Sequence, residues 1–359
     1  MAVTSRLGLV LAVTFTICFV TGLISHLIQH PPSWFVWPSR PAGLYRVTQG
    51  LHVICGIASI PLLLAKLWNV YPKLFARPVV RSAAHALERG SVLVLSAAAL
   101  FELVTGLFNV AQNYPWNFYF PQVHYAVAWV AVGSILVHVA VKLPLIADGL
   151  RRRKEPEHAP ERARLVSRRA FLGSTAVATG AAVVATAGVT VPWLRPVSVL
   201  SWRGSGPQGV PVNRTAAGAG VVEAASAGDW RLEIATAAGV RRFSLAELRG
   251  LPQTTATLPI ACVEGWSQQA EWTGVALPDL LRAVGAAPGS VVAVRSLEQR
   301  GLYAASVLPG THTADPATLL ALRLNGEVLD LDHGFPCRII APNRPGVLQT
   351  KWVSRLEVR

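Results

Sequence analysis

Charged residues are scarce in this sequence. They make up 14% of its 359 residues, whereas apolar residues make up 52%. Soluble globular proteins usually carry about 25% charged residues. The composition therefore excludes an ordinary soluble protein and indicates a membrane protein with a soluble part.

Acidic residues are the scarcer of the two charge types, with 19 against 33 basic residues and a formal net charge of +14. Nucleic-acid binding needs basic residues gathered on one folded face with aromatic residues between them. Here they cluster in short loops between apolar runs, a topology signal of membrane proteins. We therefore predict the membrane, and no nucleic acid, as a partner.

Cysteine is also rare, with four residues. Cys18 and Cys55 lie in apolar runs and are expected to be small membrane-buried residues. Cys262 and Cys337 lie in the more polar C-terminal half. Because no dense cysteine framework exists, the C-terminal half must be held together by its core.

Apolar runs long enough to cross about 30 Å of hydrocarbon are plentiful. Five are predicted to span the membrane: Leu7–Ile28, Leu51–Trp68, Ser91–Val110, His124–Ile146 and Ala170–Val191. The connecting stretches Lys73–Arg89 and Arg151–Arg169 are basic, whereas Gln29–Gln49 and Ala111–Val123 are rich in Trp and Tyr. Since basic loops stay inside, we expect a multi-pass protein of the cell membrane with a cytoplasmic N-terminus and an extracytoplasmic C-terminal domain.

A twin-arginine sequence, Ser167–Leu172, precedes the fifth apolar run and resembles a Tat export signal placed mid-chain. The alternative is that Arg168 and Arg169 only complete a basic flank. The Tat route carries folded proteins, so the resemblance implies that the C-terminal half folds around a cofactor before export.

The chain divides into four expected segments. These are a four-helix transmembrane domain (1–150), a basic loop with the Tat-like motif and fifth helix (151–194), a loose linker (195–228) and an extracytoplasmic domain (229–359). In the last, short apolar runs at Arg231–Ile234, Val291–Arg295, Cys337–Ile340 and Trp352–Val358, with one helix at Leu277–Val284, predict a compact, β-rich α+β fold.

Four histidines fall within the apolar runs, where ionisable groups are costly and invite a functional interpretation; His26 lies at the outer end of the first run. His52 and His124 lie at similar depth near the outer ends of the second and fourth runs. His138 follows His124 by fourteen residues, which returns to nearly the same helix face about 21 Å lower. Stacked imidazoles of this kind suit two haems; the alternative is interfacial histidines that only form hydrogen bonds.

Residues 6–150 resemble the four-helix cytochrome b family, which includes bacterial cytochrome b561 and the formate dehydrogenase gamma subunit. The resemblance implies an outer haem b held by His52 and His124, and an inner one held by His138. The family's remaining histidine would fall near Leu9 and is missing. His85 is a possible substitute, but lies deeper toward the cytoplasm than His138. One haem b is therefore expected, and a second is left open.

Cys262 stands in the segment Pro259–Ser267. Its pattern alone leaves four interpretations open: an inert thiol, a disulfide with Cys337, a nucleophile or a metal ligand. No second cysteine stands at zinc spacing. A lone thiolate suits a metal whose other ligands come from an organic cofactor.

Three ordered segments resemble the sulfite oxidase fold family, nearest its periplasmic methionine sulfoxide reductase branch. They are Cys262–Val275, Asp332–Asn343 and Gln349–Val353. The resemblance implies that Cys262 binds molybdenum beside the dithiolene of molybdopterin. Arg338 and Lys351 would hold the pterin phosphate, and His333 would bind the cofactor or pack a turn.

Together these features predict a membrane-bound molybdenum oxidoreductase. Electrons would move between the quinone pool, haem b and an external molybdopterin centre that transfers oxygen to or from a small S- or N-oxide type substrate. The alternatives are a metal-free, membrane-anchored binding or sensor module, and a cytochrome b whose outer half is a scaffold.

Overall fold

The computed structural model describes residues 2–74, 77, 80–151, 167–202, 204–301 and 304–359. The chain forms two compact units. The helical unit comprises residues 1–23 and 50–202, and the sheet unit comprises residues 24–49 and 203–359. The segment 24–49, which connects the first two long helices, therefore belongs with the C-terminal domain.

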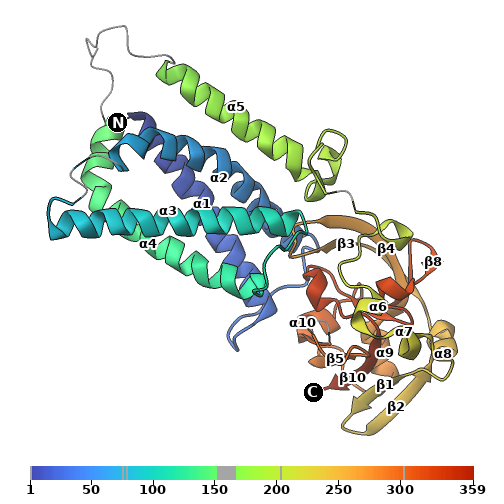
Figure 1. Cartoon of the computed structure of the whole chain (residues 1–359). Helices are drawn as coiled ribbons and strands as arrows, with labels where there is room; N and C mark the ends of the chain where they lie inside the picture. Colours follow the sequence, from blue (N-terminus) through green and yellow to red (C-terminus); the bar gives the residue numbers. More distant parts are fainter. Residues whose placement is uncertain (1, 75–76, 78–79, 152–166, 203, 302–303) are drawn as a thin grey trace. The chain divides into compact units, whose positions relative to one another are not determined.

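Five helices are long and apolar enough to cross a membrane, which confirms the five predicted apolar runs. They are α1 (Ala2–Gln29), α2 (Leu44–Leu74), α3 (Ala83–Val110), α4 (Phe120–Arg151) and α5 (Arg168–Thr186), labelled in Figure 1. Helix α3 begins eight residues before the predicted Ser91, because the Ser82 side chain accepts a hydrogen bond from His85 N and caps its first turn.

The helices pack through small clusters of aliphatic side chains rather than through a wide core. Leu7 and Leu11 of α1 meet Leu62 and Leu63 of α2, with Ala99 of α3 beside them. Many other apolar side chains on these helices are exposed. Helices with apolar outer faces suit a hydrocarbon environment, because a helix satisfies its own backbone hydrogen bonds.

The Tat-like motif opens α5. The Ser167 side chain accepts a hydrogen bond from Ala170 N, and Arg168 and Arg169 in the first turn are exposed. The rest of the predicted basic loop, residues 152–166, lies outside the described residues.

The sheet unit contains two five-stranded sheets. The first has the order β2-β1-β10-β5-β6, and the second has the order β3-β4-β7-β8 with β9 paired to β7. The strands of the first sheet are β1 (Arg231–Thr236), β2 (Gly239–Ser244), β5 (Val292–Ser296), β6 (Ala305–Leu308) and β10 (Val353–Val358). Those of the second are β3 (Thr254–Ala261), β4 (Ser267–Ala276), β7 (Leu319–Leu324), β8 (Glu327–Val328) and β9 (Arg338–Ile340).

The main core lies between the two sheets. Leu232 and Ile234 of β1 alternate with more exposed neighbours and join Leu320 and Leu322 of β7 in one cluster. Helix α9 (Leu277–Ala283) adds its buried leucines. All four predicted strands and the predicted helix correspond to observed elements, so the β-rich α+β fold is confirmed for this part of the chain.

One close backbone approach in the second sheet requires glycine. A Cβ at Gly274 would lie 2.1 Å from Leu320 O of the paired strand, where the β4–β7 register shifts. Any side chain here would force the strands apart. This explains the glycine in the Trp272–Val275 part of the motif.

The segment expected to be a loose linker is packed instead. It contains η4 (Pro207–Gly209), α6 (Ala216–Ala219) and α7 (Val222–Ser226). Ala216, Val221 and Ala225 are buried in one cluster with Trp352. Small side chains allow these short helices to pack tightly against the indole, so a Gly/Ala-rich composition does not imply a free coil here.

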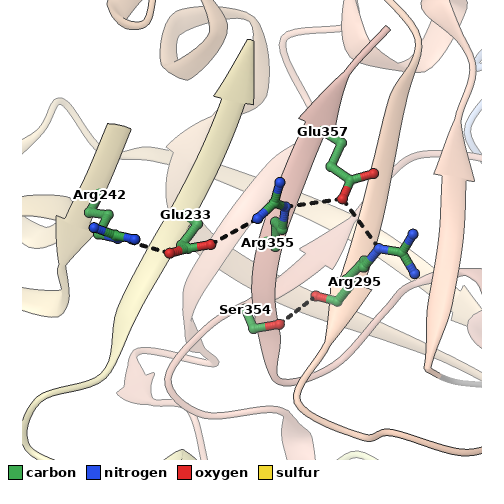
Figure 2. Close-up of polar contacts among 6 residues, drawn as sticks. All are labelled: Glu233, Arg242, Arg295, Ser354, Arg355 and Glu357. Carbon is green, nitrogen blue, oxygen red and sulfur yellow. Dashed lines mark hydrogen bonds and ion pairs between the residues drawn. The ribbon is translucent and has the colours of Figure 1, made fainter. Parts of the chain in front are cut away.

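An ionic network crosses the first sheet (Figure 2). Glu233 accepts from Arg242 Nε at 2.8 Å and pairs with Arg355 at 3.1 Å, and Glu357 links Arg355 with Arg295. These residues alternate with the core residues of β1 and β10 and so occupy the opposite face of the sheet.

Candidate cofactor sites

Cys262 occupies a tight turn between β3 and β4. Its backbone N–H donates to Trp266 O at 2.9 Å, and Gly265 N–H donates to Cys262 O at 3.0 Å. Gly265 has φ +91°, a conformation that glycine adopts without strain. The thiol is therefore held at a fixed place at the end of a sheet hairpin.

Two polar side chains lie close to the Cys262 thiol. Asn213 Nδ2 donates to Cys262 Sγ at 3.3 Å, and the Sγ lies 3.6 Å from Glu264 Oε2. Burial and, next, the Glu264 carboxylate raise the pKa of Cys262 well above its ordinary value. The free thiol is thus protonated, and a coordinated metal would be needed to make it a thiolate.

Cys337 is a separate buried thiol whose Sγ lies 3.7 Å from Val353 O. Both Cys262 and Cys337 are free. The disulfide considered between them does not form, which leaves Cys262 available as a ligand.

Arg338 and Lys351 line the same small pocket as Cys262. Arg338 Nη1 donates to His333 O at 3.0 Å, while its guanidinium lies 5.1 Å from the centre of the Trp272 ring. Lys351 Nζ donates to the carbonyl oxygens of Arg214 and Asp332, each at 2.7 Å. Both cations are held by carbonyl groups rather than by ion pairs.

A third buried cation, Arg344, lies near Arg338 in the sequence. It donates to Val307 O at 3.0 Å. Burial lowers the pKa of Arg338 to about 9, of Arg344 to about 10 and of Lys351 to about 7. Within the described residues none of the three has a carboxylate within 4.0 Å, although Asp332 and Glu298 act on Lys351 from further away.

These cations fit an anionic cofactor. The Nε atoms of Arg338 and Arg344 are buried and lack a hydrogen-bond partner among the described atoms. Buried, uncompensated positive charge is costly, and an anion with several acceptor oxygens would remove the cost. A thiol beside such cations is the donor set expected for a molybdenum–pterin phosphate group.

His333 lines the same pocket but is fixed by the protein itself. Its Nε2 lies 2.7 Å from Pro207 O. Burial and, next, Arg338 lower its pKa to about 4, so the ring is neutral at physiological pH. The next residue, Gly334, has φ +108°, and a Cβ there would lie 3.0 Å from that of Lys351. The His-Gly turn thus lets the backbone approach both cations closely.

Sequence reasoning did not find Asn213 or the ion pair, at 2.9 Å, between partly exposed Arg214 and buried Glu298. It also did not find Arg344. Asn213 and Arg214 lie in the segment expected to be a linker. The signal available there was the presence of two polar residues among Gly and Ala. Arg344 directly follows the matched Ala-Pro-Asn segment.

In the helical unit, His52 of α2 and His124 of α4 face one another. Their ring centroids lie 6.3 Å apart with an interplanar angle of 70°. His52 Nδ1 lies 2.9 Å from Cys18 O, and His124 Nδ1 lies 3.0 Å from Glu102 Oε2. Each ring therefore has its Nδ1 occupied, and among the described residues no partner contacts its Nε2.

This arrangement fits an iron ion between the two rings. With a metal–nitrogen bond of about 2 Å on each side, the centroids of two axial imidazoles stand about 6 Å apart. Metal-bound histidines usually direct their second nitrogen at a carboxylate or a backbone carbonyl, as both do here. A Cβ at Gly22 would lie 3.1 Å from His52 Cε1, so a small residue is needed beside the ring.

His138 has no comparable partner. Among the described residues it forms no ring contact with another histidine; Lys66, Lys142 and Glu88 act on it electrostatically. Lys66 follows His52 by fourteen residues, and its Nζ lies 3.0 Å from the Cβ position of Gly8. An amino group thus stands beside the part of α1 where the family's missing histidine would fall.

Parts of the chain are similar to known proteins. Residues 219–359 match the family model "Oxidoreductase molybdopterin binding domain". Mitochondrial sulfite oxidase of Drosophila melanogaster is 30% identical over 155 residues, covering 36% of this chain and 27% of that protein. The "Putative protein-methionine-sulfoxide reductase subunit YedZ1" of Azospira oryzae is 31% identical over 139 residues, covering 38% of this chain and 52% of that protein.

Among solved structures, the sulfane dehydrogenase SoxCD from Paracoccus pantotrophus is 26% identical, with a TM-score of 0.34, and the match covers 36% of this chain and 38% of that chain. The chain thus spans about half or less of each of these relatives. The C-terminal part of the chain is a molybdopterin-binding oxidoreductase domain of the sulfite oxidase type.

Proposed function

We propose that the chain is a membrane-bound molybdenum oxidoreductase that exchanges electrons with quinones through haem b. The observation that carries this proposal is the buried thiol of Cys262 beside Arg338 and Lys351, in a pocket where neither cation forms an ion pair with a carboxylate among the described residues. This donor set suits a metal bound to an anionic organic cofactor.

Each side chain has a defined task in this proposal. Cys262 would hold the metal, and Asn213 would donate to its sulfur and fix its direction. Arg338, Arg344 and Lys351 would bind anionic groups of the pterin. When bound, the molybdenum cofactor would supply two-electron oxygen-atom transfer, while the protein orients it and excludes water.

The membrane half would supply electrons. His52 and His124 would ligate one haem b, with Glu102 and the Cys18 carbonyl setting the tautomer of each ring. The quinone pool is the partner proposed for this half. A second haem at His138 would need a further axial ligand, for which His85 is the candidate among the described residues; both histidines act electrostatically on Glu88.

The proposed substrate is a small S- or N-oxide. The Azospira protein named as a sulfoxide reductase subunit supports reduction, whereas the Drosophila protein named as a sulfite oxidase supports the opposite direction. The twin-arginine sequence supports export of a folded, cofactor-loaded domain across the cell membrane. We infer from the loop charges that the N-terminus is cytoplasmic and the C-terminal domain extracytoplasmic.

Metal and haem analysis of the purified protein tests the proposal. The chain is produced in a host that builds the molybdenum cofactor, and we expect one molybdenum and at least one haem b per chain. Dithionite-reduced protein should then be reoxidised by a small sulfoxide. A haem-loaded protein without molybdenum would overturn the proposal and favour a scaffold or a metal-free binding module.

A further inference from the structure

The segment 24–49 is tied to the C-terminal domain by one buried side chain, that of Asn343. Its Oδ1 accepts from Tyr45 N at 2.6 Å, and its Nδ2 donates to Pro38 O at 2.7 Å. Its backbone N–H donates to Ala42 O at 3.0 Å, and its carbonyl accepts from Trp37 Nε1 at 2.8 Å. Every polar group of Asn343 is thus engaged with this segment.

Around this contact the segment is further fixed. Arg40 forms two hydrogen bonds with Asp315, each at 2.8 Å. Tyr45, which is 1% exposed, packs with Ile28 against Ala261, the residue before Cys262. The start of α2 is therefore held in a fixed place beside the Cys262 turn.

Gln49 makes the most direct contact with that turn. Its Nε2 donates to Val263 O at 3.1 Å, and its side chain is nearly buried. Val263 is covalently joined to Cys262. Gln49 lies on α2, and His52 follows it on the same helix after three residues, a rise of about 4.5 Å.

We propose that Gln49 is the positioning residue for electron transfer between the haem held by His52 and the metal held by Cys262. The route consists of covalent bonds along α2 from His52 to Gln49, one hydrogen bond to Val263, and covalent bonds to Cys262. It rests on the proposed function. Electron tunnelling decays less steeply through bonds and hydrogen bonds than across gaps, so this single hydrogen bond controls the coupling.

The electron count is simple in the reductive direction. A quinol would release two electrons and two protons at the membrane half, and the haem held by His52 and His124 would relay the electrons singly. The molybdenum cofactor held by Cys262 would use the pair, with two protons from solvent, to reduce an S-oxide to the sulfide and water. The same route serves the reverse direction.

The other contacts of the segment do not offer an equal route. The hydrogen bonds of Trp37, Pro38 and Ala42 end at Asn343, whose own chain neighbours do not bind the metal in the proposed site. The Arg40–Asp315 pair ends on α10 (Gly310–Thr313) and the loop after it. Tyr45 packs against Ala261, the other neighbour of Cys262, but only through non-bonded contact. These contacts hold the segment, whereas Gln49 reaches a residue next to the metal ligand through a hydrogen bond.

The test uses Gln49→Leu, which keeps the side-chain size and removes the donor. Gln29→Leu is the matched control, because Gln29 bonds only to Ser25 of its own helix in the described contacts. Haem in the intact, cofactor-loaded protein is reduced, sulfoxide is added, and the single-turnover reoxidation of the haem absorbance is followed by stopped flow.

We expect haem reoxidation to slow about tenfold in Gln49→Leu, equivalent to about 1.4 kcal/mol of barrier. Gln29→Leu should match the unmodified protein. Sulfoxide reduction driven by a small viologen donor, which reaches the molybdenum centre directly, should be unchanged in both. If Gln49→Leu does not accumulate, Gln49→Asn serves instead, because the shortened amide cannot reach Val263 O.

An unchanged reoxidation rate, with both cofactors present, would overturn the role of Gln49 while leaving the proposed function intact. Loss of viologen-driven activity together with haem reoxidation would also overturn it, because Gln49 would then only support the Cys262 turn. Absence of haem or molybdenum from the unmodified protein would instead overturn the proposed function.

Discussion

His52 and His124 lie on different helices with their ring centroids 6.3 Å apart, and each directs Nδ1 at an acceptor of its own. Among the described residues no partner contacts either Nε2, so the two rings have the arrangement that a metal ion between them would need.

Replacing either ring should therefore remove the haem. We expect His52→Ala and His124→Ala each to lose the low-spin haem b absorbance, because a single imidazole leaves iron one axial ligand short. His26→Ala is the control, since His26 stacks on His30 at 4.7 Å instead. Pyridine haemochrome assays measure the content; full haem in His124→Ala would contradict the assignment.

Glu102 should tune that haem rather than bind it. Its carboxyl group lies 3.0 Å from His124 Nδ1 and, as the hydrogen-bond acceptor, makes the imidazole a stronger donor to iron, which favours the ferric state. We expect Glu102→Gln to raise the midpoint potential and to weaken haem retention by about 10-fold or more. Redox titration measures the shift, with Thr105→Val as the control beside the same ring. A lower potential would show that the carboxylate does not act on the iron.

Cys262→Ser should abolish molybdenum binding without unfolding the domain. Serine keeps the size and the turn hydrogen bonds but removes the thiolate that the metal requires. Cys337→Ser is the control, because Cys337 is equally buried and free but bonds only to Val353 O among the described residues. Metal analysis of the purified variants tests this prediction. We expect background molybdenum in Cys262→Ser and full molybdenum occupancy in Cys337→Ser. Equal metal content in both would exclude Cys262 as the ligand.

Local patterns predicted the parts of this molecule that depend on neighbours in sequence. Long apolar runs identified the five helices, and alternating or continuous apolar residues identified β1, β5, β9 and β10. The Cys262 turn likewise depends on a residue close in sequence, Gly265, which has positive φ three residues after the cysteine. Those features need little tertiary information.

What sequence reasoning missed depends on tertiary contacts. Asn213 reaches Cys262 across 49 residues from a segment without periodicity. Strand β2 was missed because its charged residues, Arg241 and Arg242, resemble a loop; Arg242 is accommodated by pairing with Glu233 on the exposed sheet face. Helix α2 begins at Leu44 rather than Leu51, because Tyr45 and its neighbours are buried by partners distant in sequence.

The buried ring of His312 should make the C-terminal domain sensitive to acid. His312 is 1% exposed, and its Nε2 has no hydrogen-bond partner among the described atoms. Burial and then Arg344 lower its pKa to about 3, although Asp315 and the Pro342 backbone act in the opposite direction. In the unfolded chain the same ring titrates near 6.5.

Between these two values the unfolded state binds a proton that the folded state excludes, so folding weakens as pH falls through this window. The slope is at most about 1.4 kcal/mol per pH unit for one proton. We expect His312→Gln to make the C-terminal domain less acid-sensitive between about pH 6 and 4, measured by tryptophan fluorescence during denaturant unfolding of the detergent-solubilised chain. His30→Gln, an exposed histidine in the same unit, should leave the acid limb unchanged. Equal acid sensitivity of His312→Gln and the unmodified chain would show that His312 takes up its proton without unfolding.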